Sequence, residues 1–203
     1  MKQRLPEITM RHLAVAVAGI LVAGAAGLAF SDSDDDHDDD DHHRGRHGTW
    51  VKPREDVAPV ANAAYAEECG ACHMAYQPGL LPTAAWKLIM APQGLSAHYG
   101  DDASLADESR VQIAAYLEAN AADLASRSRS RAFAKGGSSE GGLPRITGTR
   151  YFRNEHHEIP RRLVADNPEV RSFSRCDACH QGAADGVYNE HRVRIPGHGR
   201  WDD

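Results

Sequence analysis

The sequence predicts a mostly α-helical protein, built from short helices and long irregular loops and divided into two small blocks. Apolar residues recur at helical spacing in segments 57–65 and 106–124, whereas no stretch shows the alternation of a half-buried strand. Aromatic residues make up only 6% of the 203 residues, and 18 Gly and 10 Pro add many turns. This composition limits the size of any core, so neither a long α/β enzyme domain nor a β-barrel is expected.

Changes in composition divide the chain into five parts. The predicted parts are a signal peptide or membrane anchor at 1–30, an acidic His-rich tether at 31–48, a first domain at 49–125, a linker at 126–142 and a second domain at 143–203. The tether has high charge and no apolar residue, so we expect it to be disordered. The linker is rich in Ser, Arg and Gly.

The N-terminus is typical of an exported protein. Lys2, Arg4 and Arg11 precede an uncharged run of 18 residues at 13–30. That length lies between a signal-peptide core and a minimal membrane span, so a cleaved signal and a retained anchor both stay open. Either alternative places the rest of the chain outside the cytoplasm, and we therefore expect a periplasmic protein, soluble or tethered to the inner membrane.

The net charge of −6 argues against a nucleic-acid partner, because nucleic-acid-binding proteins present a basic face. Segment 31–48 carries eight Asp against Arg44 and Arg46 and accounts for most of this acidity. Its four His could bind divalent metal loosely, but nothing there fixes a coordination geometry, so a solvated tether is the favoured interpretation.

Helical patterns are clearest in the first domain. One leads toward Cys69 through 57–65, one covers 83–90 after Pro82, and one covers 106–124. In the last of these the predicted buried stripe consists of Val111, Ala114, Leu117 and Ala121, widened by Ile113 and Tyr116.

All four cysteines fall into two copies of one motif. Cys69 and Cys72 precede His73, and Cys176 and Cys179 precede His180, each in the order Cys-x-x-Cys-His. This is the attachment signature of c-type haem. Two thiols at this spacing reach the two vinyl groups of a porphyrin, and the following His gives the iron an axial imidazole. Haem also supplies the apolar surface that the second domain, about 60 residues long, lacks. The fold is therefore expected to be organised around two covalent haems.

Other uses of four cysteines explain the pattern less well. A Cys₄ zinc site gives no reason for a His after each pair. A thioredoxin-like pair would be accompanied by a βαβ pattern, which is missing here. Structural disulfides suit an exported chain, but Cys-x-x-Cys pairs rarely connect distant loops.

The sixth iron ligand decides between an electron carrier and an enzyme. For the first haem, His98 is the favoured candidate and Met90 the alternative, although Met90 lies in an apolar helical run typical of a core. For the second haem, His156 or His157 is favoured over His191 and His198. Exchange of ligands between the two domains also stays open.

The sequence resembles the small dihaem cytochrome c family. The resemblance covers nearly all of residues 60–197 and rests on these segments in order: 75–82 after the first motif, Trp86, His98-Tyr99-Gly100, 151–159, the second motif and 193–196. It implies an exported electron-transfer protein with one bis-His haem in each of two domains, and it implies His98 and His156 as distal ligands. Some members serve an oxygen-binding monohaem cytochrome c, and others are thought to receive electrons from a membrane cytochrome b.

The expected function is therefore single-electron transfer between redox proteins, without catalysis and with membrane contact only through an N-terminal anchor. The alternatives are a dihaem subunit of a larger reductase and, less favoured, a small haem enzyme such as a peroxidase. A peroxidase needs an open iron position, a distal acid–base group and a longer chain. A reductase subunit would differ from a free carrier only in its partner.

Overall fold

The computed structural model describes residues 55–135 and 142–201. The signal segment and acidic tether predicted at 1–30 and 31–48 lie outside the described residues. All described residues belong to one compact unit, Gly48–Asp203. Below, residues 55–135 are called the N-terminal half and residues 142–201 the C-terminal half.

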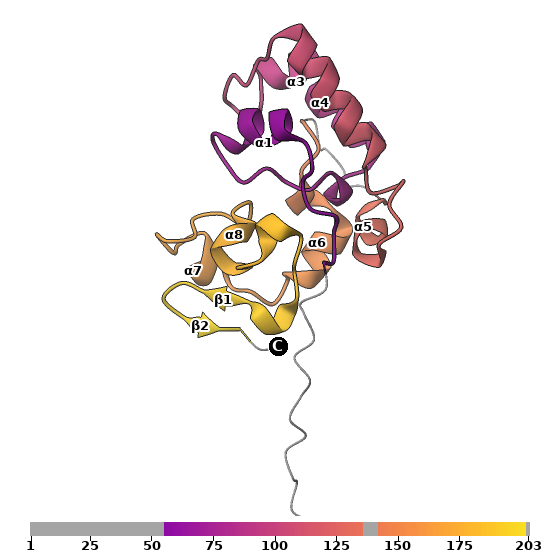
Figure 1. Cartoon of the computed structure of the whole chain (residues 1–203). Coiled ribbons are helices and arrows are strands. Elements are labelled where there is room, and N and C mark those ends of the chain that lie inside the picture. The colour runs from indigo at the N-terminus through magenta and orange to yellow at the C-terminus, as the bar shows by residue number, and fades with distance from the viewer. Residues whose placement is uncertain (1–54, 136–141, 202–203) are drawn as a thin grey trace, which may run out of the picture. The chain divides into compact units, whose positions relative to one another are not determined.

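The fold consists of short helices joined by irregular segments and one small hairpin (Figure 1), which confirms the predicted fold class. The helices of the N-terminal half are α1 (Ala63–Gly70), η1 (Pro78–Leu80), α2 (Thr83–Met90), α3 (Pro92–Ser96), α4 (Asp107–Ala119) and α5 (Ser128–Phe133). The C-terminal half contains η2 (Ile146–Gly148), α6 (Arg150–Glu155), α7 (Arg161–Val164), α8 (Cys176–Cys179), η3 (Ala183–Asp185) and η4 (Glu190–Arg192). Its antiparallel strands are β1 (Arg194–Ile195) and β2 (Gly199–Arg200).

The core of the N-terminal half lies where α2 and α4 pack together beside α1. Ile113 and Leu117 of α4 are fully buried, as the helical pattern predicted, but Val111 of the predicted stripe is 57% exposed. Helix α4 ends at Ala119 instead of 124, because Asn120 leaves the helical conformation and its side-chain amide donates to the Tyr116 carbonyl.

Helix α1 begins later than the periodicity predicted. Residues 57–61 are not helical, because Pro59 restricts the residue before it to extended backbone. The helix begins after Asn62, whose side chain accepts a hydrogen bond from the Tyr65 amide at 2.8 Å. Val57 is nevertheless fully buried, in a different part of the core.

Residues 128–133 form helix α5, although they fall inside the segment predicted to be a linker. The sequence of this segment is polar, but Phe133 and Ser130 are both buried. Phe133 packs edge-on against Tyr151 at 4.9 Å between ring centres. Packing against η1, together with the contact of Phe133 with the C-terminal half, therefore orders a helix that composition alone did not predict.

A buried cluster connects the two halves. Val57, Leu80 and Phe133 of the N-terminal half pack with Phe152 of the C-terminal half. The predicted division into domains at 49–125 and 143–203 stays a prediction, but the described parts of both share this cluster.

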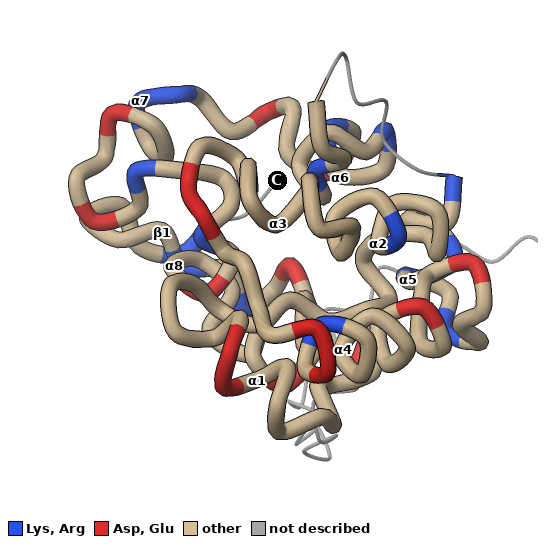
Figure 2. The backbone as a smooth tube through the Cα atoms, turned by 90° about the horizontal axis from the view of Figure 1, so that it is seen from above, with Lys and Arg blue, Asp and Glu red and all other residues tan. Residues whose placement is uncertain are grey.

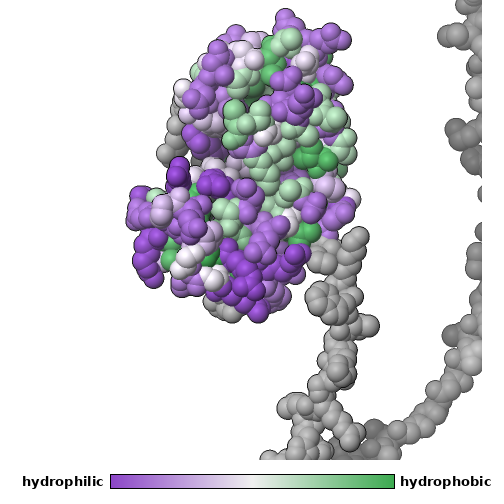
Figure 3. Space-filling view, turned by 60° about the vertical axis from the view of Figure 1, so that its left-hand side comes forward, coloured by the Kyte–Doolittle hydropathy of each residue, from purple (hydrophilic) through white to green (hydrophobic). Residues whose placement is uncertain are grey.

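Charged residues are spread over several elements of the molecule. Figure 2 shows acidic residues on α1 and α4 and basic residues on α7. In Figure 3 strongly hydrophilic residues gather over the lower part of the molecule, where Figure 1 places α7, α8 and the hairpin. Within residues 55–135 and 142–201, no helix has the length and apolarity that a membrane span requires.

Candidate functional site

The first Cys-x-x-Cys-His motif lies at the end of α1. Cys69 belongs to the last turn of the helix and is half-buried, and Cys72 is exposed just beyond it. Neither is paired in a disulfide. The helical turn places the two sulfurs and the His73 ring at one end of α1.

His73 and His98 face each other across a gap of the size that a metal ion requires. Their ring centres are 6.4 Å apart and their planes are inclined by only 16°. A metal–imidazole bond is about 2 Å long and the ring centre lies ~1 Å further, so two imidazoles on opposite sides of one metal have centres about 6 Å apart. The backbone holds His98 in a tight turn, with hydrogen bonds in both directions to Asp101 at 2.8 and 3.1 Å.

The second motif forms α8. Cys176 and Cys179 begin and end this helix, and His180 follows it in an extended conformation paired with Val193. The ring of His156, which directly follows α6, lies 6.1 Å from the His180 ring, with 66° between the planes. This pair therefore has the same separation as the first but nearly perpendicular rings.

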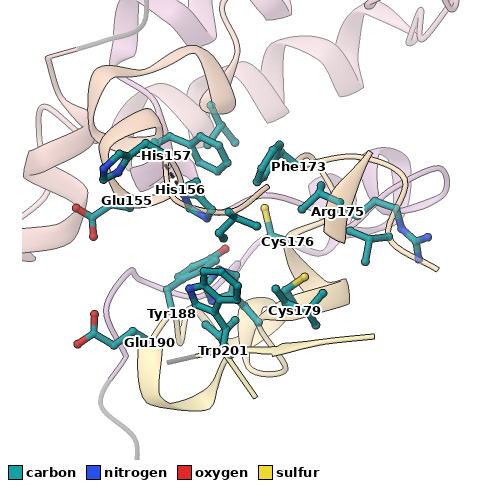
Figure 4. A pocket seen from close by; sticks show the side chains of 18 of the residues that line it. Glu155, His156, His157, Phe173, Arg175, Cys176, Cys179, Tyr188, Glu190 and Trp201 are labelled. Atoms are coloured by element: carbon teal, nitrogen blue, oxygen red, sulfur yellow. Dashed lines mark hydrogen bonds between the residues drawn. The ribbon is translucent and has the colours of Figure 1, made fainter. Parts of the chain in front are cut away.

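A cavity of about 360 Å³ surrounds the second pair (Figure 4). This volume falls within the ~300–1,000 Å³ range of cofactor sites. Its walls include both sulfurs of the second motif and apolar side chains from both halves: Leu80, Phe133, Phe152, Ile159, Val164, Phe173, Val193, Ile195 and Trp201. A flat apolar cofactor attached to Cys176 and Cys179 fits such a lining.

Of the tandem histidines, His156 is the one whose ring faces His180. His156 stacks on Phe152 at 3.9 Å between ring centres, and its Nδ1 lies 2.9 Å from the Phe152 carbonyl. His157 is exposed and pairs with Glu158 at 3.7 Å. Both residues line the cavity, but it is the His156 ring that lies against the His180 ring.

The other candidate ligands lie elsewhere. Met90 is 4% exposed and packs in the core of the N-terminal half. His191 is exposed next to Glu190, and His198 is exposed in the hairpin turn. Each of these residues has a structural environment that does not require a metal.

The chemistry of the thiols argues against the redox alternative. Burial, with a smaller contribution from Glu68, raises the pKa of Cys69 to about 11, and burial followed by Asp177 raises that of Cys176 to about 12. Thiol exchange needs the thiolate, which such pKa values disfavour. Within the described ranges, no three His, Cys, Asp or Glu side chains are grouped to hold a metal ion.

His98 and His180 are in the form that binds iron. Burial, followed by the neighbouring His156 and then Arg129, lowers the pKa of His180 to about 4. Burial, followed by His73, lowers that of His98. Both imidazoles are therefore neutral at pH 7, and neutral imidazole is the ligating form.

Ring nitrogens supply a test of the fit to haem. In His73, Nδ1 lies 2.8 Å from the Met74 carbonyl, which favours the tautomer that leaves Nε2 to bind a metal. In His98 and His180, Nδ1 is buried and has no hydrogen-bond partner among the described residues. These two rings are therefore not held through Nδ1 as His73 is, and their fit to haem rests on the facing pairs and on the apolar cavity beside the second motif.

Sequence reasoning did not identify the residues that support the histidines. Tyr76 stacks on His73 at 4.8 Å, and Tyr188 lies against His180 at 5.4 Å. Gln77, which is fully buried and directly follows Tyr76, connects the two tyrosines, since its side-chain oxygen accepts a hydrogen bond from the Tyr188 hydroxyl at 2.6 Å. Phe152 is four residues before His156, a helical spacing that could have indicated its role; Tyr188 has no comparable signal.

Comparison with curated protein sequences gave no match. Among solved structures, the diheme cytochrome type c from Shewanella baltica OS155 is 42% identical, with a TM-score of 0.57, 70% of this chain covered and 98% of that one. The diheme cytochrome c from Rhodobacter sphaeroides is 39% identical, with a TM-score of 0.54 and coverage of 65% and 100%.

The family model of the dihaem cytochromes c matches residues 65–188, a span that contains both attachment motifs and all four facing histidines. This chain therefore belongs to the dihaem cytochrome c family, and two haem c groups are covalently attached to it.

Proposed function

We propose that this protein is a periplasmic electron carrier that passes single electrons between redox protein partners through two bis-His haems. His73 and His98 would hold one iron, and His180 and His156 the other. The observation that carries the proposal is the repeated separation of 6.4 and 6.1 Å between facing imidazoles, each pair beginning at an attachment motif. Haem iron supplies the one-electron chemistry, and no bond is made or broken.

The residues support transfer without catalysis. Two imidazoles per iron saturate its coordination and leave no position for a substrate, as a peroxidase would require. Apolar side chains around the second pair, Phe152 and Phe173 among them, exclude water from the iron ligands. Burial of this kind, together with the axial ligands, sets the reduction potential of a haem iron.

Export is supported by the sequence, since Lys2, Arg4 and Arg11 precede the uncharged run at 13–30. The proposed partners are proteins that carry their own redox group. The resemblance to the family favours an oxygen-binding monohaem cytochrome c as one partner class and a membrane cytochrome b as another. Contact with either would be small and transient, as is typical of redox encounters.

Low-temperature electron paramagnetic resonance of the oxidised protein tests the ligands. Nearly parallel imidazole planes at one iron and nearly perpendicular planes at the other should give two distinct low-spin signals: a rhombic one from the first haem and one with a larger maximum g value from the second. His98→Ala should remove the rhombic signal and His156→Ala the other.

His157→Ala is the matched control and should change neither signal. Reduced wild-type protein should bind no carbon monoxide, whereas His98→Ala and His156→Ala should each bind one equivalent per chain. Stoichiometric carbon monoxide binding by the wild type would show an open iron and favour an enzyme. Loss of a low-spin signal in His157→Ala would reject the assignment of His156.

A further inference from the structure

The cavity at the second motif contains a charged group that the proposed function does not use. Arg129 of α5 lines this cavity, with 28% of its side chain exposed. It comes from the N-terminal half, whereas the attachment motif, Cys176 to His180, belongs to the C-terminal half. Leu80 and Phe133 also line the cavity from the N-terminal half.

The guanidinium of Arg129 is only partly satisfied by protein. One terminal nitrogen donates to the Tyr151 hydroxyl at 3.0 Å. The Nε atom is buried, and no described residue accepts a hydrogen bond from it. The carboxylate of Asp56 is 3.9 Å from Nε, beyond hydrogen-bonding distance, and the same oxygen accepts from the Tyr188 amide at 2.7 Å.

Because the Arg129 guanidinium is partly buried and its Nε donor is unused, an anionic acceptor in the cavity would stabilise it. Leaving a donor of a charged group unpaired costs more than leaving a neutral one. A haem offers two propionate carboxylates, and Arg matches a carboxylate through two parallel hydrogen bonds. Arg175 also lines the cavity, but it is exposed and one of its terminal nitrogens donates to the Glu169 carbonyl at 3.2 Å.

We propose that Arg129 donates hydrogen bonds to a propionate of the haem attached at Cys176 and Cys179 and thereby raises the reduction potential of that haem. The inference rests on the proposed placement of this haem between His156 and His180. A cation that neutralises a propionate stabilises the reduced iron, which carries one positive charge less. Arg129 is therefore a positioning and tuning residue, contributed by one half of the chain to the haem of the other.

The test compares Arg129→Gln with Arg131→Gln in protein that carries both haems. Arg131 lies on the same helix, is exposed and does not line the cavity, so it is the matched control. A redox titration followed by electron paramagnetic resonance should show a lower potential for the second haem in Arg129→Gln and an unchanged potential for the first. Arg131→Gln should leave both potentials at their wild-type values.

Resonance Raman spectroscopy separates a direct contact from a general effect of charge. The propionate bending band of one haem should shift in Arg129→Gln and stay in place in Arg131→Gln. A lower potential with unchanged propionate bands would overturn the inference, and so would unchanged potentials. If Arg129→Gln does not retain its haem, the Arg129→Lys variant is used instead, because it preserves the charge. A shifted propionate band in Arg129→Lys supports the contact between Arg129 and the propionate, and an unshifted band refutes that contact.

Failure of the proposed function would look different. In that case the wild-type protein itself would lack one of its two low-spin signals. Two intact low-spin signals in wild type and Arg129→Gln, together with unchanged potentials and bands, would reject only the role of Arg129.

Discussion

Replacement of Gln77 by Leu should weaken the connection between the two halves of the molecule. Gln77 is fully buried, and its amide nitrogen donates to the carbonyls of Ala183 and Ala184 at 2.6 and 3.2 Å. Its oxygen accepts from the Tyr188 hydroxyl at 2.6 Å. Leu has a similar length but can make none of these bonds, which span more than 100 residues of sequence.

The magnitude follows from the groups left without partners. A buried polar group that loses its hydrogen bond costs about 1–3 kcal/mol. The Ala183 carbonyl should incur this cost in full and the half-buried Tyr188 hydroxyl only in part. Burial of the apolar Leu side chain recovers a fraction of the loss. We therefore expect Gln77→Leu to lower the free energy of unfolding by about 2 kcal/mol.

Guanidinium unfolding of the haem-loaded protein, followed by circular dichroism, measures this change. The midpoint should fall with little change in slope, as expected when stability and not compactness is altered. Tyr188→Phe removes the same hydrogen bond from the other side. The second substitution should cost less in the presence of the first, because the bond is already lost. Strictly additive effects, or a loss below about 0.5 kcal/mol in Gln77→Leu, would refute this account of the junction.

Two other predictions concern a carboxylate and a glycine. Burial raises the pKa of Asp123, but hydrogen bonds from Thr83 lower it by more, so the net pKa is lowered. The stabilisation is present above the unfolded pKa of about 3.9 and is lost as pH falls through the lower folded value. An acid titration followed by circular dichroism should thus show a smaller loss of stability below pH ~4 in Asp123→Asn than in wild type. Equal losses in the two proteins would contradict a stabilising role of the Asp123 carboxylate. Gly186 has φ +74°, and an added Cβ would lie 2.2 Å from the Val57 carbonyl oxygen. Gly186→Ala should therefore cost about 2 kcal/mol or more in the same unfolding assay, and Gly197→Ala, with φ +72° but only an ordinary contact of 3.7 Å to Glu169 Oε2, about 1 kcal/mol. Similar losses in the two variants would rule out the contact with Val57 as the cause.

Helices whose boundaries depend on local chemistry were predicted best. Pro82 and the apolar spacing after it predicted α2 at Thr83–Met90, and the structure has the same bounds. Elements that depend on distant contacts were predicted poorly. Helix α5 is ordered by packing against η1 and by the contact of Phe133 with Tyr151 of the other half, and local sequence carries no record of these contacts.

The same division holds for the candidate site. The four sulfurs and His73 and His180 follow from a motif of five adjacent residues. The choice between His156 and His157 could not follow from residue type, since both are histidines in one turn. It depends on which ring points toward His180, and that direction is set by stacking on Phe152 at a spacing of four residues. The role proposed for Arg129 was still less accessible, because the cavity that it lines belongs to a motif 47 residues further along the chain.

The C-terminal half contains few apolar residues, and the walls that it shares with the N-terminal half around the second cavity explain how it can be ordered. About 60 residues bury too little surface to be stable alone unless something adds to the core. Here the addition has two sources: the haem itself, and side chains such as Leu80 and Phe133 that reach the cavity from the N-terminal half. Because the same α5 that brings Phe133 also brings Arg129, the packing that stabilises the second haem and the charge proposed to tune it come from one helix. A substitution that loosens α5 should therefore change both the stability of the C-terminal half and the potential of its haem, whereas a change confined to the Arg129 side chain should alter the potential alone.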